Sequence, residues 1–238
     1  MTARKLGFNA LEWLVEAGSL STNPLMSVTG REEIKQAVSA NGVQVASICA
    51  HCVLQWRPFD EGGAARATLF NEVVLAAGAA KMERVVVPIL EEATVAKAGS
   101  LALAAGIFRS VVRVAETAKV DLAFEMDRPA EECREFIELL GSPRAKLCYD
   151  SGNATSLGFD IIREIKALLP VVAEIHLKDR RVGGASQPLG CGDTKFGDFF
   201  QTLKAQNWRG PFVFETPVLD DPAGQAQQNL QFVSEFWS

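Results

Sequence analysis

Short apolar runs rich in β-branched and aromatic residues alternate with longer amphipathic segments along the whole chain, and this alternation limits the fold more than any other feature. Seven such runs are almost continuously hydrophobic, which is typical of strands covered on both faces of a parallel sheet. They are ALEWLV (10–15), VQVASIC (43–49), RVVVPIL (84–90), DLAFEM (121–126), AKLCYD (145–150), VAEIHLK (172–178) and PFVFET (211–216). We therefore expect a parallel sheet built from successive strand and helix units.

The intervening segments have the periodicity of helices that cover such a sheet. They predict helices over 31–40, 64–80, 101–118, 129–140, 160–169 and 196–206, and a last helix near 222–236. A chain of 238 residues, of which 48% are hydrophobic, has the size of one α/β barrel. The prediction is an α/β fold of the TIM-type (β/α)8 class, in which residues 1–238 form a single domain.

The start of the chain does not fit a barrel of eight strand and helix units. The segment MTARKLGFNA has room for part of a helix, but not for a strand and a helix. We expect residues 1–9 to form a helix fragment, so that the first barrel strand is missing or replaced. Because an open sheet edge exposes unpaired backbone groups, a local substitute or a contact in a homo-oligomer is expected there.

Charge and hydropathy argue against nucleic acid and membrane partners. The net charge of −5 gives no field that attracts phosphate backbones, and the basic residues are scattered rather than striped along one face. No leader segment and no apolar stretch of about 18 residues is recognisable, so we expect a cytoplasmic enzyme. The five cysteines fit reduced thiols. Cys49 and Cys52 have CxxC spacing without a second pair, and we interpret them as packing residues at a strand end.

Four consecutive predicted strands end on an acidic or imidazole side chain, namely Glu125, Asp150, His176 and Glu215. In a βα barrel, the C-terminal ends of the strands converge on the face where active sites are built. A buried carboxylate without a partner is costly, so it is normally neutralised, paired or bound to a cation. Three carboxylates and one imidazole form an oxygen-rich ligand set, which favours Mn²⁺ or Mg²⁺ and also allows Co²⁺ or Zn²⁺.

Each of these residues has a simpler explanation when it is considered alone. Glu125 could pair with Arg128, Asp150 could cap the following turn, and His176 could be a satisfied core histidine. The joint placement at four neighbouring strand ends is what favours a metal site.

The motifs AFEMD, CYDSGN, HLKDR, QPLGCGD and GPFVFETP, in this order and spacing, resemble the signatures of the sugar phosphate isomerase/epimerase group. These are xylose-isomerase-like barrels that include ketose 3-epimerases. The resemblance implies that Glu125, Asp150, His176 and Glu215 hold the metal, and that Glu125 and Glu215 also act as acid and base.

The resemblance implies a reaction on a ketose or ketose phosphate that passes through an enediolate. One glutamate removes a proton next to the carbonyl, and in a 3-epimerase the second glutamate returns a proton to the opposite face. In an aldose–ketose isomerase the proton instead moves between C1 and C2. An inosose-type dehydratase and a non-catalytic sugar-binding barrel are the alternative functions.

Four further residues are predicted to contact the sugar: Glu12, His51, Asn153 and Arg180. Glu12, in the first predicted strand, and His51, just after the second, are interpreted as facing the same side of the sheet. Asn153 occupies the position of a histidine in some epimerases of the family, and Arg180 follows the metal-binding histidine closely. The loops that shape the pocket are expected at 51–63 and 180–195.

Overall fold

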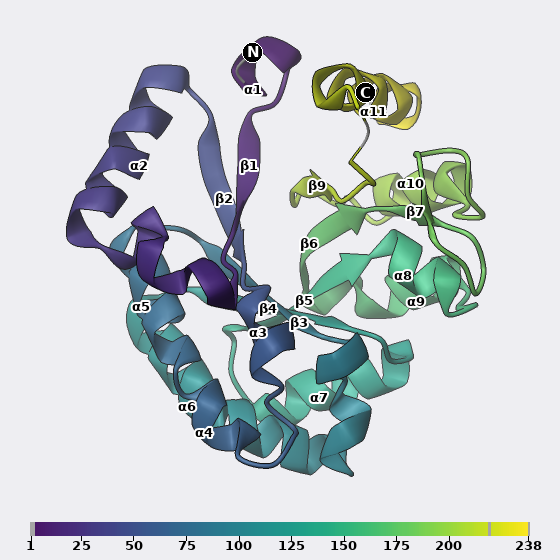
Figure 1. Cartoon of the computed structure of the whole chain (residues 1–238). Coiled ribbons are helices and arrows are strands. Elements are labelled where there is room, and N and C mark those ends of the chain that lie inside the picture. The colour runs from purple at the N-terminus through teal and green to yellow at the C-terminus, as the bar shows by residue number, and fades with distance from the viewer. Residues whose placement is uncertain (1–2, 219, 238) are drawn as a thin grey trace. The chain divides into compact units, whose positions relative to one another are not determined.

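The computed structural model describes residues 3–218 and 220–237, and it confirms the predicted α/β architecture (Figure 1). The described residues contain a sheet of seven strands, hydrogen-bonded in the order β1-β2-β3-β4-β5-β6-β9. The pairs β1–β2, β2–β3, β3–β4, β4–β5 and β6–β9 are parallel. The strands are β1 (Ala10–Leu14), β2 (Gln44–Cys49), β3 (Arg84–Ile89), β4 (Asp121–Met126), β5 (Ala145–Asp150), β6 (Val172–Leu177) and β9 (Phe212–Phe214). All seven fall inside the predicted runs.

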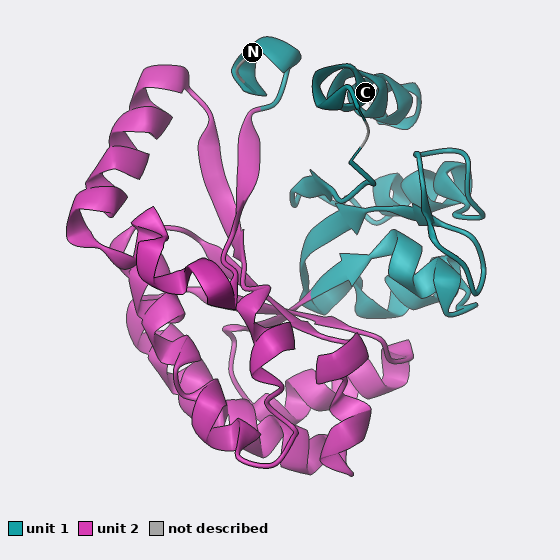
Figure 2. Cartoon of the chain, in the orientation of Figure 1, with its two compact units in different colours: residues 1–8, 148–238 teal, residues 9–147 magenta. Residues whose placement is uncertain are grey.

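Helices follow the strands in the expected alternation. The α-helices are α1 (Ala3–Leu6), α2 (Val28–Asn41), α3 (Cys52–Trp56), α4 (Gly63–Ala67), α5 (Phe70–Ala79), α6 (Leu101–Ala118), α7 (Ala130–Leu140), α8 (Ser151–Ser156), α9 (Ile161–Leu168), α10 (Phe196–Ala205) and α11 (Pro222–Phe236). Short 3₁₀ helices are η1 (Ala17–Thr22), η2 (Pro24–Met26), η3 (Glu91–Ala93), η4 (Val95–Ala98) and η5 (Leu169–Val171). The chain divides into two compact units, residues 9–147 and residues 1–8 with 148–238, and the boundary falls within β5 (Figure 2).

In the unit of residues 9–147, three aromatic rings join the sheet to its helices. Phe124 of β4 is fully buried, and its ring packs edge-on against Phe108 of α6 at 5.3 Å and Phe136 of α7 at 5.2 Å. Helix α6 has the predicted bounds because Ser100 accepts a hydrogen bond from the amide of Leu103 at its start. Burial of these rings helps to hold the two helices against the sheet.

In the unit of residues 1–8 and 148–238, an aromatic cluster packs α10 against β9 and α11. Phe200 of α10 is almost completely buried and contacts the rings of Phe212, Phe236 and Trp237 at 5.6 to 6.0 Å. The cluster fixes the C-terminal helix beside the last strand.

The N-terminal prediction is confirmed for the residues that the structure describes. Residues 3–6 form the single helical turn α1, and no strand precedes β1 within residues 3–9. The amide of Gly7 donates to the carbonyl of Arg4, which closes the turn. Residues 1–2 of this prediction lie outside the described part of the chain.

Several local features differ from the sequence prediction. Helix α3 lies within the loop expected at 51–63. The helix expected over 64–80 is divided into α4 and α5 around Thr68, whose hydroxyl donates to the carbonyl of Ala65 at 2.5 Å. The loop after β6 contains a small antiparallel ribbon of β7 (Asp179–Arg180) and β8 (Ser186–Gln187). Two-residue strands carry no period-2 signal, so the sequence did not indicate them.

The described residues include no single helix that is long and apolar enough to cross a bilayer. The segments 91–98 and 101–118 satisfy the length and composition criterion together, but they are bent by 114° relative to each other. Cys49, Cys52 and the other three cysteines carry free thiols. Burial raises the pKa of the Cys52 thiol to about 12, which agrees with the interpretation of this residue as a packing residue.

Candidate metal centre

Asp150 is the last residue of β5, and its two carboxylate oxygens have different surroundings. Oδ1 accepts a hydrogen bond of 2.6 Å from the amide of Asn153 and thereby caps α8. Oδ2 is buried and has no hydrogen bond with the part of the chain that the structure describes; the ammonium group of Lys178 lies 3.7 Å away. Asp150 therefore both caps a helix and presents a carboxylate oxygen that suits a cation.

His176 lies on β6 and is 1% exposed. Its Nδ1 is 2.9 Å from Oε2 of Glu215, and its Nε2 is 3.5 Å from Oε1 of Glu174, which is also fully buried. The hydroxyl of Ser151 lies 3.2 Å from the carbonyl oxygen of His176 and ties this strand to α8. Packing and hydrogen bonds thus fix both the backbone and the ring of the histidine.

Glu215 directly follows β9, and its amide donates to the carbonyl of Leu177 on β6 at 3.2 Å. Oε1 of Glu215 accepts a hydrogen bond of 2.5 Å from Nζ of Lys178. The residue after it, Thr216, accepts hydrogen bonds from the side-chain amides of Gln225 and Asn229 on α11. The end of the short strand is therefore held by the helix that follows it.

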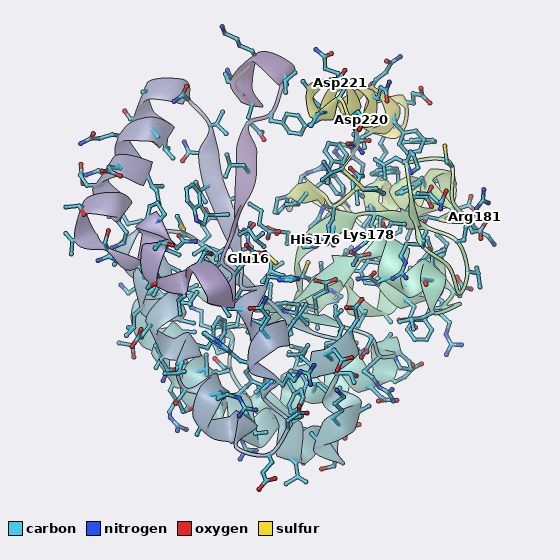
Figure 3. All side chains as sticks on the ribbon, viewed as in Figure 1. Glu16, His176, Lys178, Arg181, Asp220 and Asp221 are labelled. Atoms are coloured by element: carbon cyan, nitrogen blue, oxygen red, sulfur yellow. The ribbon has the colours of Figure 1, made fainter. Side chains whose placement is uncertain are left out.

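These three residues bring their potential ligand atoms together. One ligand atom each of Asp150, His176 and Glu215 lies within 4.8 Å of the others. His176 and Lys178 are neighbours in Figure 3, and both contact Glu215, at 2.9 and 2.5 Å. Two carboxylates and one imidazole at this spacing are suited to a divalent cation, and the buried Oδ2 of Asp150 fits that role.

The electrostatic environment acts on the two carboxylates in opposite directions. Burial raises the pKa of Asp150 to about 6, although the charges of Lys178 and His176 oppose that rise. Burial also disfavours ionisation of Glu215, but the hydrogen bond from His176 and the charges of His176 and Lys178 outweigh it and lower the pKa of Glu215 to about 2. Glu215 is consequently an ionised carboxylate at neutral pH.

Glu125 belongs to the unit of residues 9–147, where it is the penultimate residue of β4. Its side chain is 5% exposed, and it lies opposite Pro88 in the register of β3 and β4. Arg128 donates two hydrogen bonds to Glu132, at 2.8 and 3.0 Å. The structure thus places Glu125 at a strand end as predicted, and it gives Arg128 another carboxylate partner.

The residues predicted to contact a sugar have these positions. Oε2 of Glu12 accepts a hydrogen bond of 3.0 Å from the hydroxyl of Ser47 across β1 and β2. His51 immediately precedes α3, and its Nδ1 is buried without a hydrogen bond to any described residue. Arg180 donates a hydrogen bond from Nη1 to Oδ1 of Asn153 at 3.0 Å. These two side chains, both predicted to contact the sugar, are therefore hydrogen-bonded to each other.

Sequence reasoning did not identify the role of Asp179. Its carboxylate is fully buried and accepts hydrogen bonds from the amides of Gly190, Gly192 and Thr194, at 2.8 to 3.1 Å. It thus anchors the far end of the loop that begins at Arg180. The only signal for this was an acidic residue followed by a glycine-rich segment.

Comparisons with known proteins show the family and the fold of the chain. The model of a protein family described as the xylose isomerase-like TIM barrel matches residues 2–236. L-ribulose-5-phosphate 3-epimerase of Escherichia coli is 29% identical over 130 residues, which cover 51% of this chain and 46% of that protein. The match thus spans about half the length of such curated relatives.

Two solved structures illustrate the shared fold. D-psicose 3-epimerase with D-tagatose, from Clostridium cellulolyticum, has a TM-score of 0.76 at 17% identity, covering 98% of this chain and 90% of that one. A xylose isomerase-like TIM barrel protein from Mycobacterium smegmatis, in complex with magnesium, has a TM-score of 0.72 at 18% identity, covering 98% of this chain and 85% of that one.

Proposed function

Because the chain belongs to the family of xylose isomerase-like TIM barrels, we propose that it is a metal-dependent sugar epimerase or isomerase that acts on a ketose or ketose phosphate. The observation that carries the proposal is the convergence of Asp150, His176 and Glu215, whose ligand atoms lie within 4.8 Å of one another. In a βα barrel this edge of the sheet is where catalytic residues gather. The similarity to an L-ribulose-5-phosphate 3-epimerase supports the same class of substrate.

The proposed ligands of one divalent cation are Glu125, Asp150, His176 and Glu215. Glu125 is included because it is the penultimate residue of β4, the strand that pairs in parallel with the first half of β5. An oxygen-rich set of this kind suits Mn²⁺ or Mg²⁺, and a solved relative is described in complex with magnesium. When bound, the cation would polarise the carbonyl of the ketose and stabilise negative charge that develops on its oxygen.

The two glutamates would carry the proton. Glu215 lies beside His176 and Lys178, and as the proposed base it would accept a proton from the carbon next to the ketose carbonyl and leave an enediolate. Glu125 would supply a proton to the opposite face of that carbon and invert it. Glu12, His51, Asn153 and Arg180 are proposed to bind the hydroxyl or phosphate oxygens of the sugar.

The test of this mechanism replaces each proposed acid or base by its amide. Glu125→Gln and Glu215→Gln keep an oxygen and nearly the same volume, but they remove the carboxylate that takes a proton. Since acid–base groups contribute about 10²–10⁴-fold to rate, each variant should lose at least about 100-fold in kcat on a ketose substrate. The matched control is Glu138→Gln on α7, whose carboxylate is 70% exposed and which should retain the parent activity.

Isotope exchange in heavy water separates the candidate reactions. A 3-epimerase incorporates deuterium at C3 of the ketose, a C1–C2 isomerase labels C1 or C2, and an inosose-type dehydratase releases a product that is lighter by one water. If a panel of ketoses and ketose phosphates shows no exchange and no turnover, while both Gln variants bind sugars as well as the parent, the chain is a sugar-binding protein rather than an enzyme.

A further inference from the structure

Lys178 brings a positive charge to two of the proposed metal ligands. Its side chain is only 14% exposed, and Nζ lies 2.5 Å from Oε1 of Glu215 and 3.7 Å from Oδ2 of Asp150. The other oxygen of Glu215, Oε2, lies beside Nδ1 of His176 at 2.9 Å. The carboxylate of Glu215 therefore contacts an ammonium group through one oxygen and an imidazole through the other.

The position of Lys178 is fixed by its own backbone and by α8. The hydroxyl of Ser151 accepts a hydrogen bond from the amide of Lys178 at 3.1 Å and lies 2.8 Å from its carbonyl oxygen. A Cβ atom at position 152 would lie 2.8 Å from Cβ of Lys178, so Gly152 is what allows this close approach. With its backbone bonded to Ser151 and its stem against Gly152, the side chain is only 14% exposed and its ammonium group lies at the carboxylates rather than in solvent.

We propose that Lys178 is a positioning residue that acts as an internal counter-ion of the metal centre: its ammonium group holds Asp150 and Glu215 together and weakens their affinity for a divalent cation. This inference rests on the metal site proposed above. Asp150 and Glu215 together carry a charge of −2, and Lys178 reduces it to −1 from 3.7 Å and 2.5 Å, respectively. A divalent cation must therefore bind against the repulsion of a nearby positive charge.

The counter-ion has a consequence for how the centre is assembled. Two carboxylates that are brought close without a cation repel each other and lose hydration. Lys178 offsets both costs within the protein itself, so the ligands are in place before a metal binds. Lys178 thus positions the ligands in advance and lowers their affinity for the cation. The bound metal is consequently exchangeable.

The test measures metal binding directly and does not depend on the substrate. Protein stripped with a chelator is titrated with Mn²⁺ by calorimetry and by the electron paramagnetic resonance signal of free Mn²⁺. Lys178→Met removes the charge and keeps most of the volume, so it should bind Mn²⁺ at least about tenfold more tightly than the parent. Lys178→Arg keeps the charge and should stay within about threefold of the parent.

A matched control separates this local effect from the change in net charge. Lys195→Met alters the net charge by the same amount at an exposed position, and its Mn²⁺ affinity should match the parent. In addition, metal-free Lys178→Met should have a lower midpoint of thermal unfolding than the metal-free parent, and Mn²⁺ should raise it by more. If Lys178→Met does not fold without metal, the Mn²⁺ affinity and the unfolding midpoint of Lys178→Gln are compared with those of the parent instead.

The outcomes distinguish the failure of this inference from the failure of the proposed function. If the parent binds Mn²⁺ at Asp150 and Glu215 but Lys178→Met and Lys178→Gln bind it no more tightly, Lys178 is not a counter-ion of the centre. Weaker binding by both variants would also overturn the inference, because it would mean that Lys178 supports the cation. If the parent itself binds no Mn²⁺ at these residues, the metal site is refuted.

Discussion

The substitution Asp179→Asn tests whether one buried carboxylate holds the loop that follows β6. Oδ2 of Asp179 accepts hydrogen bonds from the amides of Gly190 and Gly192, at 2.9 and 2.8 Å, and Oδ1 accepts one from the amide of Thr194 at 3.1 Å. A Cβ atom at position 192 would lie only 2.1 Å from Oδ1, so the loop backbone closes directly onto the carboxylate. Asparagine has nearly the same shape but only one acceptor oxygen.

The expected loss follows from these three hydrogen bonds. The remaining oxygen of asparagine can accept two of the amides, while its NH₂ group faces the third donor, so one bond to a charged group is lost at about 1.5–3 kcal/mol. The other two become neutral bonds and weaken by roughly 0.5 kcal/mol each. The total is roughly 3 kcal/mol. For a chain of this length, about 2–4 °C per kcal/mol gives a fall in the unfolding midpoint of roughly 6–12 °C.

The assay is thermal unfolding followed by circular dichroism and calorimetry, with Asp193→Asn as the control. Asp193 lies in the same loop and also accepts backbone and guanidinium hydrogen bonds, from Val182 and Arg181, but it is exposed. Exposed ion pairs contribute little, so the control should leave the unfolding midpoint close to that of the parent. Equal effects of the two substitutions, or a loss below 1 kcal/mol for Asp179→Asn, would refute the anchoring role.

Two further predictions concern the core and the thiols. Phe124→Ala removes a fully buried ring and should lower the free energy of unfolding, measured in urea, by about 3–5 kcal/mol. The control is Leu103→Ala, at a position that is 64% exposed. If Phe124→Ala destabilises the protein no more than this control, the described packing is wrong. Alkylation at pH 8 should modify the exposed Cys191 first and Cys52 last, because a thiol whose pKa is raised to about 12 has almost no thiolate below that pH. Mass spectrometry that finds Cys52 labelled early would show that it is accessible and ionised.

The strands could be predicted closely because each is a buried apolar run with a clear end. The segments 121–126 and 145–150 were predicted with the bounds of β4 and β5, and 101–118 with the bounds of α6. These elements end where a charged residue, a cap or a left-handed residue stops the periodic pattern. The ribbon at 179–187 could not be predicted, because its two-residue strands depend on hydrogen bonds between segments rather than on hydropathy.

For the candidate site, the sequence indicated which residues stand at strand ends but not how their side chains are paired. Placement at the end of a strand follows from the pattern of the chain, so Asp150 and His176 could be named. The partner of Lys178 could not, because a flexible side chain selects among several carboxylates by rotamer and by burial. The hydrogen-bond partners of Arg180 could not be predicted for the same reason. Arg180 was expected to contact a sugar, and in the structure its guanidinium donates to Asn153 and to the carbonyl of Gly184.

Glu215 shows why strand length matters for such a prediction. It follows β9, which has only three residues, so the strand alone gives the glutamate little support. Gln225 and Asn229 lie one helical turn apart on α11 and are both more than 90% buried, and their amides bond to the hydroxyl of Thr216. In sequence this spacing is typical of a solvated polar face, but buried amides must have partners. The last helix therefore holds the side chain of the residue after Glu215, so the position of the proposed base also depends on residues 10 to 14 places further along the chain.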